Sequence, residues 1–129
     1  MSGWIGVDLD GTLAYYDGWK GELNIGDPIP EMVNRVKFWL SKGKTVKIFT
    51  ARISEGAINL DGTPHDIGLV VNAIEDWCEE HIGQKLEVTN VKDFGMVELW
   101  DDRAVQVVGN TGLSLQEYLK KEYENEFKI

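Results

Sequence analysis

The chain has 129 residues and a mass of 14.6 kDa, a length typical of one domain. Apolar residues make up 43% and charged residues 27%, the balance of an ordinary folded protein, which excludes disorder as the main state. The 13 basic and 22 acidic residues give a net charge of −9, which disfavours tight non-specific binding to nucleic acid. We therefore expect a single domain over residues 1–129.

The apolar runs are short, such as residues 69–71, and fall far below the roughly 18 residues that a membrane helix needs. The first strand-like run begins at Trp4, which leaves no room for a signal peptide. The single cysteine, Cys78, cannot form an internal disulfide, as suits a reducing compartment. We expect a cytoplasmic protein that does not contact a membrane.

Strand-like runs, rich in β-branched and aromatic residues, alternate along the chain with helix-like runs. Three helix-like runs are present. The first begins near Pro30 and stops at Gly43. Several of the strand-like runs are almost continuously apolar, as is typical of buried parallel strands. We expect five strands: Trp4–Val7, Thr45–Phe49, Leu86–Val88, Val97–Trp100 and Val105–Val108.

The three helices are predicted from apolar residues that recur on one face. The face of the first carries Met32, Val33, Val36, Trp39 and Leu40; that of the second Ile67, Val70, Val71, Ile74, Cys78 and Ile82; that of the third Leu115, Tyr118, Leu119, Tyr123 and Phe127. We expect capping boxes at Thr63 with Asp66, where Pro64 begins the first turn, and at Ser114 with Glu117. Gly83 is expected to follow the end of the second helix.

This alternation predicts an α/β domain with right-handed crossovers. The expected architecture is a three-layer Rossmann-like fold, with a parallel five-stranded sheet, helices on both faces and no cap domain. In such sheets, ligands bind beyond the carboxyl ends of the strands.

Polar segments follow four of the predicted strands. They are residues 8–12, with Asp8 and Asp10 before Gly11 and Thr12; residues 50–52, which read Thr50, Ala51 and Arg52; residues 89–92, with Thr89, Asn90 and Lys92; and residues 101–103, with Asp101, Asp102 and Arg103. If the strands are parallel, all four segments converge on one edge of the sheet.

The expected chemistry of this edge is that of an anionic oxygen site. Asp8 and Asp10 stand two residues apart, so in extended chain they face the same way. With Asp101 and Asp102 they make a set of hard oxygen ligands that suits Mg²⁺. Thr50 offers a hydroxyl donor and Lys92 a positive charge for the oxygens of a phosphoryl group.

The run Asp8-Leu9-Asp10-Gly11-Thr12-Leu13 after an apolar strand resembles the first motif of the haloacid dehalogenase (HAD) superfamily. Thr50 is similar to its second motif, Lys92 to its third, and Asp101 with Asp102 to its acidic fourth. The resemblance covers roughly residues 4–108. The segments at 50–52 and 101–103 look most like small cap-less phosphatases, among them the 3′-phosphatase domains of polynucleotide kinases.

The resemblance implies a phosphomonoester hydrolase with an aspartyl-phosphate intermediate. Asp8 would be the nucleophile and Asp10 the general acid and base. Mg²⁺ would be held by Asp8, the Asp10 carbonyl, and Asp101 or Asp102. Thr50 and Lys92 would stabilise the phosphoryl group. Gly11, Thr12, Thr50, Ala51 and Arg52 would contact a substrate, which would be a small phosphate ester, a nucleotide or a polynucleotide end.

Two departures from the family pattern bear on the site. Only five steps separate Lys92 from Val97, so the helix after the third motif is missing or reduced to a turn, and Lys85 or Lys20 could replace Lys92. The free loops, about 14–29 and 52–62, are too short for a cap domain. The site is therefore expected to be open, unless loops, substrate or a partner in a homo-oligomer exclude water.

Several residues leave two interpretations open. Tyr15, Tyr16 and Trp19 could stack on a nucleobase or pack as a flap on the sheet. Thr50 could be a helix cap, and Arg52 an exposed loop residue. His65 and His81 are expected on helix surfaces and Cys78 in the core.

Two other functions compete with the phosphatase. A receiver domain also gathers acidic residues, Thr and Lys on a parallel sheet, but its phosphorylated Asp would stand where this chain has Thr50. The other is a catalytically idle binding or assembly module of the same fold, although the expected carboxylates are all present.

Overall fold

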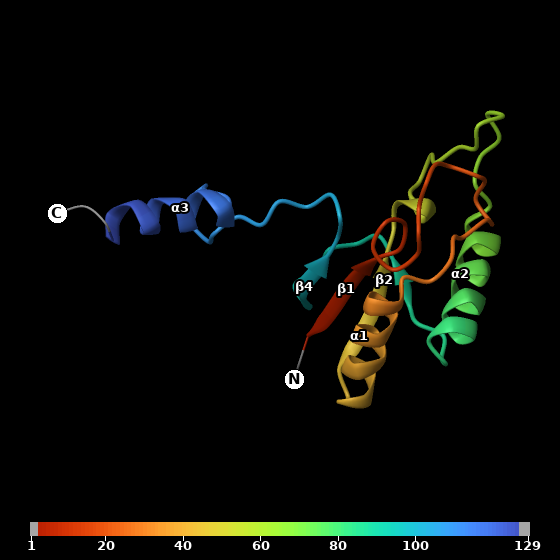
Figure 1. Ribbon diagram of the computed structural model, residues 1–129. Helices are drawn as coiled ribbons and strands as arrows, with labels where there is room; N and C mark the ends of the chain where they lie inside the picture. Colours follow the sequence, from red (N-terminus) through yellow and green to blue (C-terminus); the bar gives the residue numbers. More distant parts are fainter. Residues whose placement is uncertain (1–2, 127–129) are drawn as a thin grey trace.

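A computed structural model describes residues 3–126 of the chain. Its sheet has four strands, in the order β3-β2-β1-β4, and every neighbouring pair is parallel (Figure 1). The register pairs Asp8 with Phe49 and Val7 with Trp100, so the strands end at one edge of the sheet. The predicted parallel α/β sheet is confirmed. The strands are β1 (Trp4–Asp8), β2 (Thr45–Phe49), β3 (Val88–Thr89) and β4 (Met96–Trp100).

The fifth strand, predicted at 105–108, is wrong for the described chain. These residues join no strand, and their one β contact is an isolated bridge between Val107 and Ser114. Val105 is 74% exposed, and the chain reverses near Asn110, whose φ is 65°. β-Branched residues favour an extended backbone, but a strand also needs a neighbour to pair with.

Helix α1 (Pro30–Ser41) begins at the proline, as predicted. Pro30 lacks an N–H, so it fits the first helical position, where that group would have no partner. Past the end of the helix, Gly43 takes the left-handed φ of 77° and donates its N–H to the Leu40 carbonyl. The predicted apolar face is confirmed by burial of Met32, Val33 and Val36.

Helix α2 (Ile67–His81) is also present, but its predicted start is wrong in detail. Asp66 is itself the cap, and its side chain accepts from the Leu69 N–H at 3.2 Å. Thr63 instead bonds to Asp61, in a turn that precedes the helix. The local turn therefore takes the hydroxyl that a capping box would have used. The face of α2 buries Val70, Ile74, Trp77 and Cys78.

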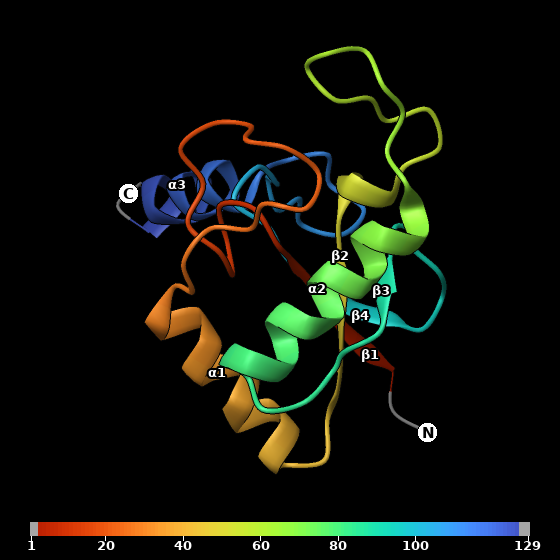
Figure 2. The ribbon, with the colours of Figure 1, turned by 90° about the vertical axis from the view of Figure 1, so that its right-hand side faces the viewer.

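The hydrophobic core lies between one face of the sheet and helices α1 and α2. Figure 2 shows both helices in front of the strands, and Ile5, Val7, Val46 and Ile48 are buried beneath them. The prediction of helices on both faces is therefore wrong for residues 3–126. The connection between β3 and β4 contains no helix, as expected.

The third helix, α3 (Leu115–Glu126), projects away from the sheet (Figure 1) and contains no buried residue. Its predicted capping box is confirmed. The Ser114 N–H donates to Glu117 Oε1 at 3.0 Å, and the Glu117 N–H donates to Ser114 Oγ at 3.1 Å. Phe127, which the sequence pattern placed on this helix, lies outside the described residues.

None of the helices described here is long and apolar enough to cross a lipid bilayer.

Candidate active site

Three carboxylates come together at the carboxyl edge of the sheet. Asp8 ends β1, while Asp101 and Asp102 follow β4, the neighbouring strand. One oxygen from each of the three lies within 4.8 Å of the others. The parallel register brings these residues together although more than ninety positions separate them in the sequence.

The loop after β1 is fixed in the core on either side of its polar residues. Leu9 and Leu13 are fully buried, and the Leu9 carbonyl accepts from the N–H groups of Leu13 and Ala14 at 3.0 and 2.8 Å. Between them Gly11 has a φ of +89°, and a Cβ there would lie 2.5 Å from Asp102 Oδ2. Glycine therefore meets two needs at once: a left-handed backbone and a close approach of the two loops.

Thr12 links the two acidic loops. Its hydroxyl accepts from the Asp102 N–H at 3.0 Å and lies 3.3 Å from Asp8 Oδ2 and 3.4 Å from Asp102 Oδ1. One hydroxyl proton can serve only one of the two carboxylates at a time. The threonine thus orients the acidic group, a role that the substrate-binding prediction for it did not include.

The environment of Asp8 disfavours the charged form of its carboxyl and so raises its pKa. Burial, a hydrogen bond with the Asp102 carboxyl and the negative charges of Asp101, Asp102 and Asp10 raise the pKa of Asp8 from 3.8 to about 7. A cation between the carboxylates would oppose each of the electrostatic causes. The oxygen-only donor set and its self-repulsion therefore fit a hard divalent cation such as Mg²⁺.

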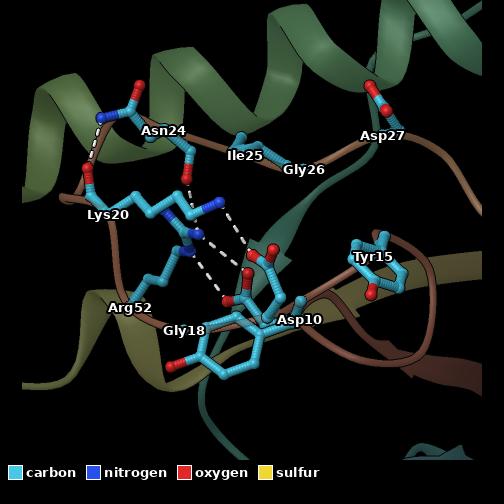
Figure 3. A pocket seen from close by; sticks show the side chains of 11 residues that line it. Asp10, Tyr15, Gly18, Lys20, Asn24, Ile25, Gly26, Asp27 and Arg52 are labelled. Carbon is cyan, nitrogen blue, oxygen red and sulfur yellow. Dashed lines mark hydrogen bonds and ion pairs between the residues drawn. The ribbon is translucent and has the colours of Figure 1, made fainter.

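Asp10, predicted beside Asp8, is placed differently. Its carboxylate is not part of the group formed by Asp8, Asp101 and Asp102, and instead binds Arg52 through both oxygens. Arg52 Nε donates to Asp10 Oδ2, and Nη2 donates to Oδ1, each at 2.8 Å (Figure 3). A bidentate pair of this kind holds the carboxylate in one orientation.

Arg52 is buried, with 5% of its surface exposed, so the alternative of an exposed loop arginine is wrong. Besides Asp10, its guanidinium donates to the carbonyls of Gly21, Glu22 and Asn24 at 3.3, 2.9 and 2.8 Å. It therefore connects the Asp10 loop to the segment 21–24, and its donors are directed into the protein. This leaves little capacity for the predicted contact with a substrate phosphate.

An aromatic stack completes the surroundings of Arg52. The guanidinium lies 4.7 Å from the Trp19 ring centre, and Trp19 in turn stacks on His65 at 5.3 Å. His65 Nδ1 donates to the Arg52 carbonyl at 2.8 Å, and the residue lies in the loop before α2 rather than on a helix surface as predicted. Two roles were left open for Trp19: stacking on a nucleobase, or packing within the protein. Its contacts with Arg52 and His65 give it the packing role.

Thr50 caps a short helix, which is one of the two roles predicted for it. The residue is 3% exposed, and its hydroxyl accepts from the Arg52 N–H at 3.1 Å at the start of the short 3₁₀ helix η1 (Ala51–Ile53). Its own N–H donates to the Thr89 carbonyl at 3.0 Å, which joins the ends of β2 and β3. Ala51, the next residue, is exposed.

The three lysines that were candidates for the third motif lie in different places. Lys92 is exposed and lines a hollow of about 740 Å³ beside β4, which also includes Asp101. Lys20 pairs with Asp17 at 2.8 Å, and Lys85 pairs with Asp76 of α2 at 3.8 Å. Of the three, Lys92 and Lys20 border hollows that contain an aspartate of the candidate site.

The hollow that Lys20 borders has a volume of about 570 Å³ and reaches Asp10 and Arg52 (Figure 3). Tyr15 and Tyr16 line it and are 62% and 39% exposed. Their rings are therefore free for a ligand, unlike that of Trp19. Cys78, by contrast, lies in the core, where burial raises the pKa of its thiol to about 12.

Sequence reasoning missed the network around Arg52 because it joins residues from three separate segments. The acceptors at 21–24 are backbone carbonyls, which leave no trace in residue type. The one available signal was the presence of Trp19 and His65 in the two loops that flank the site.

Comparisons with known proteins bear on the fold. No family model matches the chain, and no curated protein matches it. The structure is similar to that of a conserved protein from Bacteroides thetaiotaomicron, with a TM-score of 0.55 and 20% sequence identity over the whole of both chains. At that identity the likeness supports the α/β fold alone.

Proposed function

We propose that this chain is a Mg²⁺-dependent phosphomonoesterase of the HAD type, with Asp8 as its nucleophile. The observation that carries the proposal is the meeting of Asp8, Asp101 and Asp102, whose ligand oxygens lie within 4.8 Å of one another at the carboxyl edge of a parallel sheet. The first motif, at residues 8–13, supports the same assignment through its resemblance to that superfamily.

In the proposed reaction, an Asp8 oxygen attacks the phosphorus of a monoester, and the bond from phosphorus to the ester oxygen breaks. The leaving oxygen takes a proton from Asp10 and departs as an alcohol. Water then attacks the phosphorus of the aspartyl-phosphate and gives its proton to Asp10, which releases phosphate and restores the Asp8 carboxylate. When bound by Asp8 and by Asp101 or Asp102, Mg²⁺ supplies positive charge to the phosphoryl oxygens.

The chain's own residues have separate tasks in this scheme. Thr12 orients Asp8 and Asp102, and the Thr50 hydroxyl donates to a phosphoryl oxygen. Arg52 holds the Asp10 carboxylate through both oxygens, so proton donation by Asp10 requires one of these hydrogen bonds to open. Lys92 supplies a positive charge from the hollow that it shares with Asp101.

The hollow beside Asp10 supports a nucleotide as the substrate. Its volume of about 570 Å³ is within the range typical of small-molecule sites, and Tyr15 and Tyr16 offer aromatic surfaces for a base. The acidic surface disfavours a long polynucleotide, because a net charge of −9 repels a phosphate backbone.

The test is phosphate release from an aryl phosphate, a panel of mononucleotides and an oligonucleotide with a terminal phosphate, with and without Mg²⁺. We expect Mg²⁺-dependent release that is lost in Asp8→Asn. The matched control is Asp76→Asn, which changes an aspartate on α2 that is not part of the acidic group and should leave the rate unchanged. Equal rates in the Asp8 variant and the wild type would overturn the proposal.

A catalytically idle binding module is the second candidate, because Arg52 occupies both oxygens of the carboxylate that turnover needs. This function predicts that Mg²⁺ and a nucleotide bind together without release of phosphate. Isothermal titration calorimetry of the wild-type protein, beside the phosphate assay, separates the two.

A further inference from the structure

Apolar surface is concentrated in the last third of the described chain. Eight of the sixteen large hydrophobic side chains that are strongly exposed lie between positions 91 and 123. Among them, Phe94 is fully exposed, and Val97, Val105 and Val107 are 63%, 74% and 56% exposed. Where such side chains form a contiguous surface, they mark an interaction site in a folded protein.

The outer edge of β4 is one part of this surface. Within residues 3–126, β4 pairs with β1 on one side and with no strand on the other. The hollow of about 740 Å³ runs along it and is lined in part by Met96, Leu99, Asp101 and Val107. An edge strand with free N–H and carbonyl groups is a ready template for another strand.

The segment that follows β4 has the residues of a strand and one free side. At 105–108 it reads Val-Gln-Val-Val. On one side it bonds to its own chain: the Val108 N–H donates to Leu113 and the Leu115 N–H donates to Gln106. The other side has no strand beside it in the described chain. This segment therefore needs one neighbour, as β4 does.

A second set of complementary surfaces consists of helix α3 and the face of the sheet opposite α1 and α2. The 12-residue helix buries none of its residues, although Leu115, Tyr118 and Leu119 lie on one side of it. A helix of this length is marginal in water without packing. The face of the sheet opposite α1 and α2 has no helix on it within residues 3–126 (Figures 1 and 2).

We propose that residues 105–126 are exchanged between two copies of this chain. Residues 105–108 of one copy pair along the outer edge of β4 of the other, and α3 covers the open sheet face of that copy. This goes beyond the proposed function and does not depend on it. The chain's own Gln106 and Val107 line the hollow that contains Asp101 and Lys92. After the exchange, the same segment of the partner copy would line it instead, so each copy would help to close the other's site.

A second copy is the occupant that the chain itself indicates. Within residues 3–126, the outer edges of β4 and of the two-residue β3 have no neighbouring strand, and 105–108 is bonded on one side alone. One face of the sheet carries no helix, and α3 buries none of its residues. A two-fold exchange would cover the β4 edge, the free side of 105–108, the open face and the helix. The turn at 108–113 directs α3 away from its own sheet (Figure 1).

The test is the molar mass in solution, measured by size-exclusion chromatography with light scattering over a range of concentrations. We expect a mass of twice 14.6 kDa for the wild type. Leu119→Gln should shift the population to the monomer, because it puts an amide on the apolar side of α3. The matched control, Lys121→Gln on the opposite side of the helix, should remain a dimer.

Hydrogen exchange distinguishes segment exchange from another kind of dimer. Amides at 105–108 and in α3 should be protected in the wild type and lose protection in Leu119→Gln, whereas those of β1 should stay protected in both. A wild type that is monomeric at every concentration would overturn the proposal, whether or not α3 is protected. So would a dimer that the Leu119 variant leaves intact.

Discussion

Replacing Arg52 by methionine tests whether the buried guanidinium holds segment 21–24 and the Asp10 loop together. Methionine keeps much of the apolar length of the side chain but removes five donated hydrogen bonds and the positive charge. Breaking a buried ion pair by removing one partner costs about 3–5 kcal/mol. The Asp10 side chain is 21% exposed and can recover some hydration, so the lower end applies.

We therefore expect Arg52→Met to lose about 3 kcal/mol of unfolding free energy, which for a domain of this size lowers Tm by roughly 10 °C. The assay is thermal and urea unfolding followed by circular dichroism. The control is Arg103→Met, since Arg103 is exposed on the loop after β4. Adding Asp10→Asn to the Arg52 variant should restore part of the loss, because the uncompensated carboxylate is then gone. Equal Tm values for the two methionine variants would refute the reasoning.

The remaining predictions concern the acidic group and the core cysteine. The pKa of Asp8 is about 7 in the folded state and 3.8 when unfolded, so its contribution to stability is present at low pH and is lost as pH rises toward 7. In EDTA, Tm of the wild type relative to Asp8→Asn should therefore fall between pH 4 and pH 8, and a constant difference would contradict the assignment. Because Mg²⁺ competes with the proton on Asp8, added Mg²⁺ should raise Tm more at pH 8 than at pH 5, as calorimetric scans at the two pH values would measure. Thr12→Val removes the hydroxyl between Asp8 and Asp102 and should weaken Mg²⁺ binding about tenfold in a calorimetric titration. Cys78 should react with a thiol reagent only after denaturation; rapid labelling of the native protein would show that its burial is transient.

The elements whose formation depends on local sequence were the most predictable. Pro30 and the spacing of Met32, Val33 and Val36 define α1 without help from the rest of the fold. The Ser114–Glu117 capping box is equally local. For the acidic group, the residue types could be read from the sequence, whereas their proximity depends on the parallel sheet. The register of β1 and β4 places Asp8 and Asp101 at one edge of that sheet.

What could not be predicted depends on contacts between distant segments. The residues at 105–108 have strand propensity in any context, but whether they pair is decided by where the chain turns at 108–113. Likewise Arg52 is indistinguishable in sequence from an exposed arginine, since its partners at 21–24 are carbonyls that every residue type carries. Asp10 was assigned next to Asp8 by alternation along a strand, yet the strand ends at Asp8 and the alternation ends with it.

The anchoring of the loop after β1 has a consequence for the entropy of ligand binding. Leu9 and Leu13 are buried on either side of Gly11 and Thr12, so the backbone of this loop loses its conformational freedom when the core forms. Fixing a residue's backbone costs about 1–2 kcal/mol, and here that cost is met during folding rather than on binding. A ligand at Asp8 would therefore find its donors already in place and bind with little ordering of the loop. A ligand that contacts Tyr15 and Tyr16, whose rings are exposed, would still have to order these two side chains.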